Sequence, residues 1–464
     1  MTADLVARLA ALSPEQRARI RAGLPRGRAV RHPLTPGQLR LWRTHQQVAG
    51  RPVDVVCQAV HLTGGPVDLD LLAERVRGFV TAHEALRTTF EPVGGAADDG
   101  GRDGAGVRPV VHRELPPRIV RARCASADEA RALAREMAAE PFDLASGPLL
   151  RVALAERTTA GHGPAEEAWL LVVVHNLVFD AWSFELLLDE LGRPADGEPA
   201  AAPPFSGFAS DQRRWLESAD GRAAAAYWRA ETADPPPPLP TDRPRGRGTG
   251  RTGERLDFRL PREVADGIAA AAQRSAASAY TGWLAVAWAA LAEYGGSEDL
   301  LLGTFTAGRD RPGTADVVGY LLNVLPVRLR DPGDGSHAAR TRAARDATRA
   351  GLPHAAYPGE LITGRRVPGT HPLLDAVFVF DNLGEGGRRL QGARARTADL
   401  DKGTARFDLT LAVYPGPDGA EGWLEYDTEL YEEATARRIA ERFTALARSA
   451  AESAAGTDAG AGRG

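Results

Sequence analysis

The 464-residue sequence is poor in several residue types, and each shortage excludes a class of protein. Its two cysteines, Cys57 and Cys124, are too few for a disulfide framework or a multi-cysteine zinc site. No run of about 18 apolar residues occurs, and the N-terminal stretch is a charged, amphipathic helical pattern, so neither a membrane span nor an export signal is predicted. These features favour a reducing, cytoplasmic location.

Lysine is almost absent, and Lys402 is the only one. Arginine therefore supplies nearly all the positive charge, and 57 basic residues face 61 acidic ones for a formal net charge of -4. Because the two signs nearly balance, no strong field attracts nucleic acid or an anionic membrane surface. We expect neither as a partner.

The hydrophobic content of 43% is enough for large cores, and the chain length predicts two lobes or domains. Segments rich in Gly, Pro, Ala and Asp separate the folded parts. The main one has a proline run that favours an extended linker and a solvated Gly/Arg half. We predict an N-terminal helical extension (1–30), an N-terminal lobe (31–200), a connecting helix with a Pro/Gly/Arg-rich linker (201–254), a C-terminal lobe (255–453) and a disordered tail (454–464).

Local patterns place strands and helices in both halves. In "LLVVVHNLVFDAWSFELLLDEL" (170–191), a continuous apolar run predicts a strand covered on both faces, and helical spacing follows Asp180. Residues 262–296 read as two helices ending at a glycine pair, and 435–453 as a closing helix. Further strands are predicted at 254–261, 323–330, 373–382 and 406–414. The fold class is therefore mixed α/β.

Residues 175–191, "HNLVFDAWSFELLLDEL", resemble the HHxxxDG signature and following helix of condensation domains of nonribosomal peptide synthetases. Other stretches resemble further motifs of this family in the family's order. They are "LTPGQLRLW" (34–42), "HEALRTTF" (83–90), "FASDQRRWLES" (208–218), the stretch 303–330, "HPLLDAVFVFDN" (371–382) and "RFDLTLAVY" (406–414).

The resemblance implies two chloramphenicol-acetyltransferase-like lobes in a V around a central tunnel. It implies no bound cofactor, because substrates arrive on phosphopantetheine arms of carrier proteins. An acyl-loaded carrier serves one mouth, and a second carrier or a free small-molecule nucleophile serves the other. The sequence contains no adenylation motif and no GGxS carrier motif. We therefore expect a free-standing protein of natural-product biosynthesis that acts in trans.

In the family, the first His and the Asp of the signature are structural, and the second His lies beside the reacting carbonyl. The matching positions here are His175, Asp180 and Asn176, so the catalytic imidazole is missing. The glycine of the signature is replaced by Ala181, whose methyl group narrows the approach of backbone to substrate.

The resemblance also suggests roles for residues around the signature. Asp180 is expected to form an ion pair with Arg309 or Arg311, and His83 matches a position that is structural or part of the tunnel wall. For Asn323 a strand-end cap is the alternative to a tunnel position, and Trp182 also suits the core. The expected tunnel residues are Ala181, Trp182, Ser183 and Asn323.

Asparagine changes the chemistry because its amide does not titrate near neutral pH and offers only a carbonyl acceptor and two N–H donors. Asn176 is therefore no general base, a loss worth about 10²–10⁴-fold in rate. Holding both reactants together offsets this loss, and the amide can donate a hydrogen bond to an oxyanion. His175 is a poor replacement, since adjacent strand residues point to opposite faces.

Other chemistries have weaker support. A Ser183 hydrolase lacks the G-x-S-x-G elbow, and a metal at His175 and Asp180 lacks a third ligand with suitable spacing. Heterocyclising relatives carry aspartates at the signature histidines, and epimerising relatives keep both histidines. Two hypotheses remain: an acyltransferase that uses Asn176, or a catalytically inactive module that docks carrier proteins or tailoring enzymes.

Overall fold

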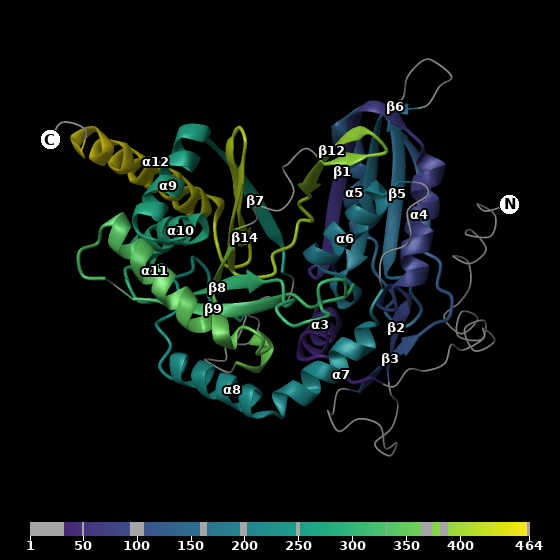
Figure 1. The fold of residues 1–464 in the computed structure, drawn as a ribbon, viewed down its shortest axis with the longest axis horizontal. Helices are drawn as coiled ribbons and strands as arrows, with labels where there is room; N and C mark the ends of the chain where they lie inside the picture. Colours follow the sequence, from purple (N-terminus) through teal and green to yellow (C-terminus); the bar gives the residue numbers. More distant parts are fainter. Residues whose placement is uncertain are drawn as a thin grey trace.

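The computed structural model describes residues 32–48, 51–92, 106–157, 165–194, 202–246, 251–330, 332–362, 374–380 and 388–461. The expected N-terminal extension, residues 1–30, lies outside these ranges. Figure 1 shows two lobes, each a sheet covered by helices, with α7 (Phe205–Leu216) and α8 (Ala219–Glu231) running below them from one lobe to the other. The predicted α/β fold of two lobes is confirmed.

The sheet of the N-terminal lobe has six strands in the order β11-β12-β1-β6-β5-β4. Strand β6 lies between β1 and β5, antiparallel to both, and its residues 168–174 are almost completely buried. This explains the continuous apolar run, since a central strand covered on both faces has no solvent side. The strands are β1 (Val55–Val67), β4 (Arg118–Cys124), β5 (Leu150–Arg157), β6 (Ala165–His175), β11 (Arg389–Leu390) and β12 (Ala393–Asp399).

Helix α5 lies against the sheet and contacts β1 and β6. Helix α3 lies at the end of the sheet and contacts the turn that follows β6. Helix α4 packs on α6. A two-stranded sheet of β2 and β3 completes the lobe. The bounds are α3 (Pro36–Gln47), α4 (Leu69–Ala82), α5 (Ala127–Ala139), α6 (Ala181–Gly192), β2 (Thr88–Pro92) and β3 (Val107–Val111).

The sheet of the C-terminal lobe has the strand order β7-β14-β13-β10-β8-β9. Helix α10 is apolar on all sides because α9, α11 and α12 pack around it, and it ends at Gly296 with φ 67°. The predicted strands and helices of this half are present. They are β7 (Gly253–Pro261), β8 (Leu300–Thr306), β9 (Asn323–Leu329), β10 (Ala376–Phe380), β13 (Leu409–Gly416), β14 (Gly419–Asp427), α9 (Arg262–Arg274), α10 (Ala279–Gly295), α11 (His337–Gly351) and α12 (Glu433–Ala461).

Two segments of the C-terminal half belong to the N-terminal lobe. Strand β12 pairs antiparallel with β1, with Val60 opposite Thr397, and carries β11 at its outer edge. The segment between β8 and β9 inserts Val317, Val318 and Tyr320 into the N-terminal hydrophobic core. The two lobes predicted from the sequence, 31–200 and 255–453, do not include these two crossings from one lobe to the other. The pattern of a strand shows which face is buried but not which strand it pairs with.

The segment after α8 is held firmly against the C-terminal lobe. Leu239 is buried in that core, and the guanidinium of Arg245 donates to the Leu239 carbonyl at 2.9 Å. Arg245 also lies 3.2 Å from the carboxylate of Asp408, which is fully buried. The prediction that the Gly/Arg-rich half of the linker is solvated is therefore wrong at Arg245. Its guanidinium compensates the charge of the buried Asp408 carboxylate.

Helix α12 continues to Ala461, through most of the predicted disordered tail (454–464). The segment "AESAAGTDAGA" (451–461) contains no proline and is rich in alanine, the strongest helix former, so the preceding helix can propagate through it.

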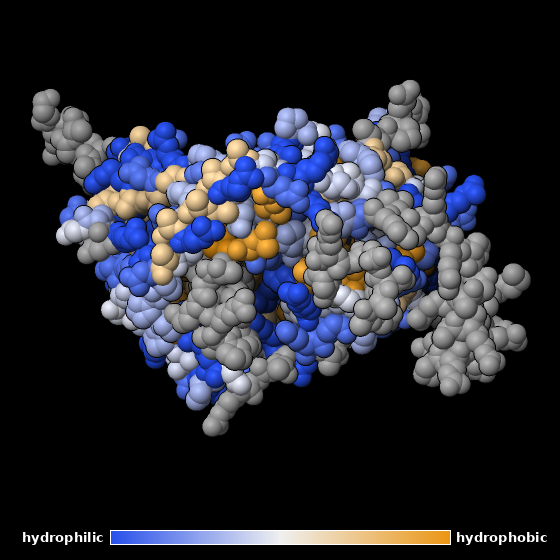
Figure 2. Space-filling model, turned by 90° about the horizontal axis from the view of Figure 1, so that it is seen from below, coloured by the Kyte–Doolittle hydropathy of each residue, from blue (hydrophilic) through white to orange (hydrophobic). Residues whose placement is uncertain are grey.

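Most of the face seen in Figure 2 is hydrophilic, with apolar residues gathered near its middle. Among the described residues, the exposed large hydrophobic side chains are Leu352 and Leu361. Within the same part of the chain, no helix has the length and apolar character needed to span a bilayer.

Candidate functional site

The signature segment lies where β6 ends and α6 begins, and His175 is the last residue of the strand. Its ring is buried, with Nδ1 accepting from the Leu177 backbone N–H at 3.1 Å and Nε2 3.3 Å from Nδ1 of His45. Because Nδ1 accepts, the neutral ring carries its proton on Nε2 and donates it to His45. Burial, with a smaller contribution from His45, lowers the pKa of His175 to about 3. His175 thus fixes the turn as a neutral ring.

His45 was not found by sequence reasoning. It lies on α3, three and four residues after the buried Trp42 and Leu41, and this helical spacing is the signal that could have placed it on the inner face. Burial also lowers the pKa of His45. Gln38 fixes α3 to the same turn, because its amide donates to the Leu177 carbonyl at 3.0 Å.

Asn176, where the resemblance implies a catalytic histidine, begins the turn that follows β6. It is 6% exposed, and its backbone N–H donates to the carbonyl of Asp54 at 2.9 Å. Its side-chain amide makes no hydrogen bond to any residue in the described ranges. The amide is therefore available to a group that enters from outside.

Asp180 holds the turn together. Its fully buried carboxylate pairs with both terminal nitrogens of Arg309, at 2.8 and 3.0 Å. It also caps α6 by accepting from the Ser183 N–H at 2.8 Å, and it accepts from the backbone N–H groups of Leu321 and Leu322. The residue that pairs with Asp180 is thus Arg309. The alternative, Arg311, instead extends over the ring of Trp215, with its guanidinium carbon 6.0 Å from the ring centroid.

The three residues after Asp180 do not share one environment. Ser183 is fully buried, and its hydroxyl donates to Asp180 and accepts from the Gly319 N–H at 3.0 Å, so its expected tunnel position is wrong. Trp182 is half-buried and donates its indole N–H to the Ala315 carbonyl at 2.9 Å. Ala181 is exposed at the first position of α6.

Asn323 and His83 have structural contacts. The Asn323 amide donates to the carbonyls of Ala355 and Tyr357, and its oxygen accepts from the Gly359 N–H at 2.8 Å, so it clamps the loop that precedes and includes Gly359. The backbone N–H of His83 caps the end of α4 by donating to the Phe79 carbonyl, and the centroids of the His83 and Phe79 rings lie 4.2 Å apart. Burial lowers the pKa of His83 to about 4.

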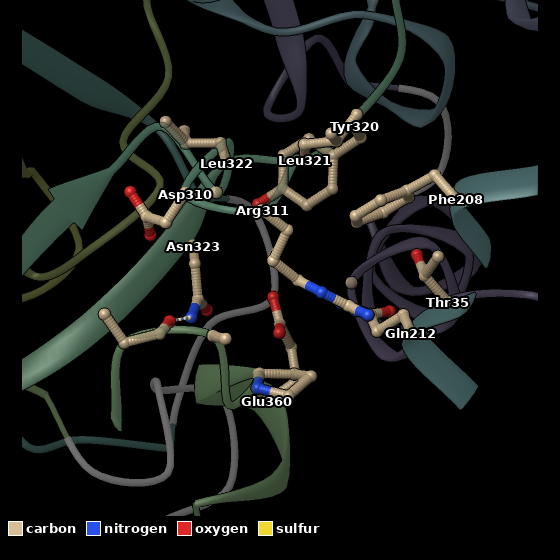
Figure 3. A pocket seen from close by; sticks show the side chains of 15 residues that line it. Thr35, Phe208, Gln212, Asp310, Arg311, Tyr320, Leu321, Leu322, Asn323 and Glu360 are labelled. Atoms are coloured by element: carbon tan, nitrogen blue, oxygen red, sulfur yellow. Dashed lines mark hydrogen bonds between the residues drawn. The ribbon is translucent and has the colours of Figure 1, made fainter. Parts of the chain in front are cut away.

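A pocket of about 40 Å³ lies between α3, α7, the loop between β8 and β9, and the loop that follows α11 (Figure 3). Asn323 lines it, and Arg311 extends from it toward α7. Asn176, Ala181, Trp182 and Ser183 are not among its lining residues. The space suits a few water molecules rather than an acyl chain. Within the described ranges, no cluster of His, Cys, Asp and Glu could hold a metal ion.

Comparisons with known proteins agree with this architecture. The condensation-domain family model matches residues 29–459. The chain is 34% identical, over 97% of its length, to phosphinothricin tripeptide synthetase PhsC of Streptomyces viridochromogenes, and covers 43% of that protein. It is 27% identical to gramicidin S synthase 2 of Aneurinibacillus migulanus, over 91% of this chain and 9% of that one. The chain therefore spans less than half the length of these relatives.

Solved structures show the same fold. The condensation domain from the monacolin K polyketide synthase MokA gives a TM-score of 0.79 at 22% identity, covering 91% of this chain and 97% of that one. The X-domain from teicoplanin biosynthesis gives 0.75 at 23% identity, covering 92% and 96%. From the family match and the fold together, the chain belongs to the condensation-domain family.

Proposed function

We propose that the chain transfers an acyl group from a carrier-protein thioester to an amine or related nucleophile in trans, with Asn176 replacing the imidazole. The observation that carries this proposal is the unused side-chain amide of Asn176, buried at the family's catalytic position. The residue is 6% exposed, yet its amide atoms are not among the side-chain atoms that are both closed to solvent and without a hydrogen-bond partner, so an entering group can reach the amide.

Asn176 contributes hydrogen bonding rather than proton removal. Its N–H groups suit the oxyanion that develops on the thioester carbonyl, an effect worth about 3 to 4 kcal/mol at good geometry. The C–N bond forms, the C–S bond breaks, and the proton that the amine releases ends on the departing thiol. Positioning of the two reactants supplies the rest of the rate increase.

The partners follow from this reaction. An acyl-loaded carrier protein presents the donor on its phosphopantetheine arm, and a second carrier or a free small molecule presents the nucleophile. Similarity to peptide synthetases such as PhsC supports a place in nonribosomal peptide-type biosynthesis in the cytoplasm. An interlobe tunnel through which both substrates reach Asn176 is part of the proposal.

A second candidate is a catalytically inactive docking module for carrier proteins or tailoring enzymes. Two observations favour it: the missing imidazole at position 176 and the fold shared with the teicoplanin X-domain, which has been solved in complex with OxyB.

The test is intact-mass analysis of an acyl-loaded carrier protein from the same pathway, incubated with candidate amines and with wild type, Asn176→Ala or Asn176→His. Melting temperatures equal to wild type serve as the folding control. Product from wild type that is lost in Asn176→Ala supports the acyltransferase.

Other outcomes separate the two candidates. Product from Asn176→His alone shows that substrates bind but the chemistry is lost, and favours docking. Absence of product from all three, with the carrier shown to bind, overturns acyl transfer.

A further inference from the structure

The hydrogen bond that holds the backbone of Asn176 lies just beyond the ends of two strands. Strand β6 ends at His175 and β1 begins at Val55, and these two residues are partners in the antiparallel ladder. The next step of the ladder is the bond from the Asn176 N–H to the Asp54 carbonyl at 2.9 Å. Because the last step of a ladder has neighbours on one side only, it opens readily unless another contact holds one of its residues. The placement of Asn176 therefore depends on what holds Asp54.

Asp54 is held by its side chain. The side chain is 2% exposed, and its Oδ1 lies 3.1 Å from Nε of Arg406 and 3.9 Å from Nη2 of Arg40. Burial alone would raise the pKa of Asp54, but Arg406, and to a smaller extent Arg40, lower the pKa below its ordinary value, so the acid is ionised. Separating one partner from a buried ion pair is costly, because the other charge stays behind uncompensated. The Arg406 guanidinium therefore restrains the carboxylate of Asp54.

Tyr320 orients both arginines. Its hydroxyl accepts from Nη2 of Arg406 at 2.9 Å and from Nη2 of Arg40 at 3.3 Å. Because Tyr320 binds Nη2 of Arg406, the Nε of the same guanidinium is directed at Asp54. Arg40 also pairs with Glu360 at 3.4 Å, so the cluster has one acid for each arginine and its charges balance.

The cluster lies where both segments that cross between the lobes come together. Tyr320 is on the segment between β8 and β9, and Arg406 is on the segment that leads from β12 back to β13. This return segment makes a second contact with the chain just before β1, where the Thr404 hydroxyl donates to the Pro52 carbonyl at 3.3 Å. A shift of either segment therefore changes the surroundings of Asp54.

We propose that Arg406 is a positioning residue for Asn176: it holds the Asp54 carboxylate, and the Asp54 carbonyl holds the Asn176 backbone. This inference rests on the proposed function, in which the Asn176 amide binds the developing oxyanion. It adds that a residue of the segment returning to the C-terminal lobe sets where that amide lies. A donor to an oxyanion loses its effect when it is displaced, so a loosened turn slows the chemical step and leaves substrate binding nearly intact.

Hydrogen exchange resolved to single amides tests the positioning and needs no turnover. The probe is the Asn176 N–H, which is bonded to Asp54. The reference is the adjacent His175 N–H, which is bonded to the Leu149 carbonyl at 3.0 Å. In Arg406→Gln, exchange at Asn176 relative to His175 should be at least about tenfold faster, because a buried charged contact is lost. A general loss of stability speeds exchange at both amides alike and leaves this ratio unchanged.

Arg255→Gln is the matched control. Arg255, on β7, also joins the two lobes, because its Nη1 donates to the Asp399 carbonyl of β12 at 3.2 Å. Its carboxylate partners are Asp257 and Asp399 rather than Asp54, so this variant should leave the exchange ratio at the wild-type value. Asp54→Asn removes the charged contact from the other side and should raise the ratio as Arg406→Gln does, which covers the case that Arg406→Gln does not fold.

In the acyl-transfer assay, Arg406→Gln should lower kcat at least about tenfold and leave KM for the acyl donor within about twofold of wild type. An exchange ratio that stays at the wild-type value in either folded variant, or that rises equally in Arg255→Gln, overturns the inference. An unchanged kcat in a variant whose ratio has risen also overturns it. Absence of acyl transfer by wild type overturns the proposed function instead, and the exchange ratio then still decides whether Arg406 holds the turn.

Discussion

Arg309→Gln should reduce the stability of the protein strongly. It leaves the carboxylate of Asp180, which is fully buried, with its backbone and Ser183 hydrogen bonds but without the cation that lies 2.8 Å away. Removing one partner of a buried ion pair costs about 3 to 5 kcal/mol, because the other charge remains uncompensated. With about 2 to 4 °C per kcal/mol for domains of 150 to 250 residues, the melting temperature should fall by roughly 6 to 20 °C.

The structure supplies a matched control. Arg311 lies two residues further on and contacts the ring of Trp215 instead of Asp180, so Arg311→Gln should change stability by less than about 1 kcal/mol. Urea unfolding measures both variants. Adding Asp180→Asn to Arg309→Gln removes the stranded charge and should recover part of the loss. A loss below about 1 kcal/mol in Arg309→Gln, or an equal loss in Arg311→Gln, would refute this reasoning.

Two more predictions concern the buried histidines and one glycine. Burial lowers the pKa of His175 to about 3 and of His83 to about 4, so the unfolded chain binds more protons below the ordinary value of 6.5. The free energy of unfolding is therefore highest above pH 6.5 and falls as the pH falls toward 4, by about 2 kcal/mol for each ring at pH 5. Unfolding measured as a function of pH should show this slope, and His83→Gln should reduce it. Gly319→Ala would place a Cβ 2.1 Å from the Phe205 ring at a φ of 152°, whereas Gly78→Ala in α4 meets no atom within 4 Å. Thermal melts should show a clear loss for Gly319→Ala and no loss for Gly78→Ala, and equal behaviour of the two would contradict the packing argument.

The sequence was most informative where one local pattern fixes one structure. The apolar run before His175 predicted β6, and the helical spacing after Asp180 predicted α6. A strand buried on both faces is apolar at every position, whereas a helix buried on one face repeats its apolar residues with the helical period. The same logic found α9 and α10. The pairing of Asp180 was narrowed to two arginines, and the structure distinguishes them by the path of the loop that carries both.

The parts that sequence reasoning missed depend on contacts between distant segments. His45 and Asp54 carry no motif of their own and gain significance only because α3 and β1 bring them to the end of β6. The addition of β12 to β1 is equally invisible, since alternation defines a face and not a neighbour. Arg245 was assigned to solvent because a Gly/Arg-rich segment gives no hint of the buried Asp408 that binds it.

The placement of β12 beside β1 has a consequence for biosynthesis on the ribosome. Strand β1 ends at Val67, but the strand that covers its outer edge, β12, begins only at Ala393 and is made much later. Until then, the nascent lobe exposes a row of unpaired N–H and C=O groups along a long strand, a template for pairing with another chain. Translation products that stop before residue 393 should therefore depend on chaperones to stay unaggregated, and slow synthesis of the second half should prolong that dependence.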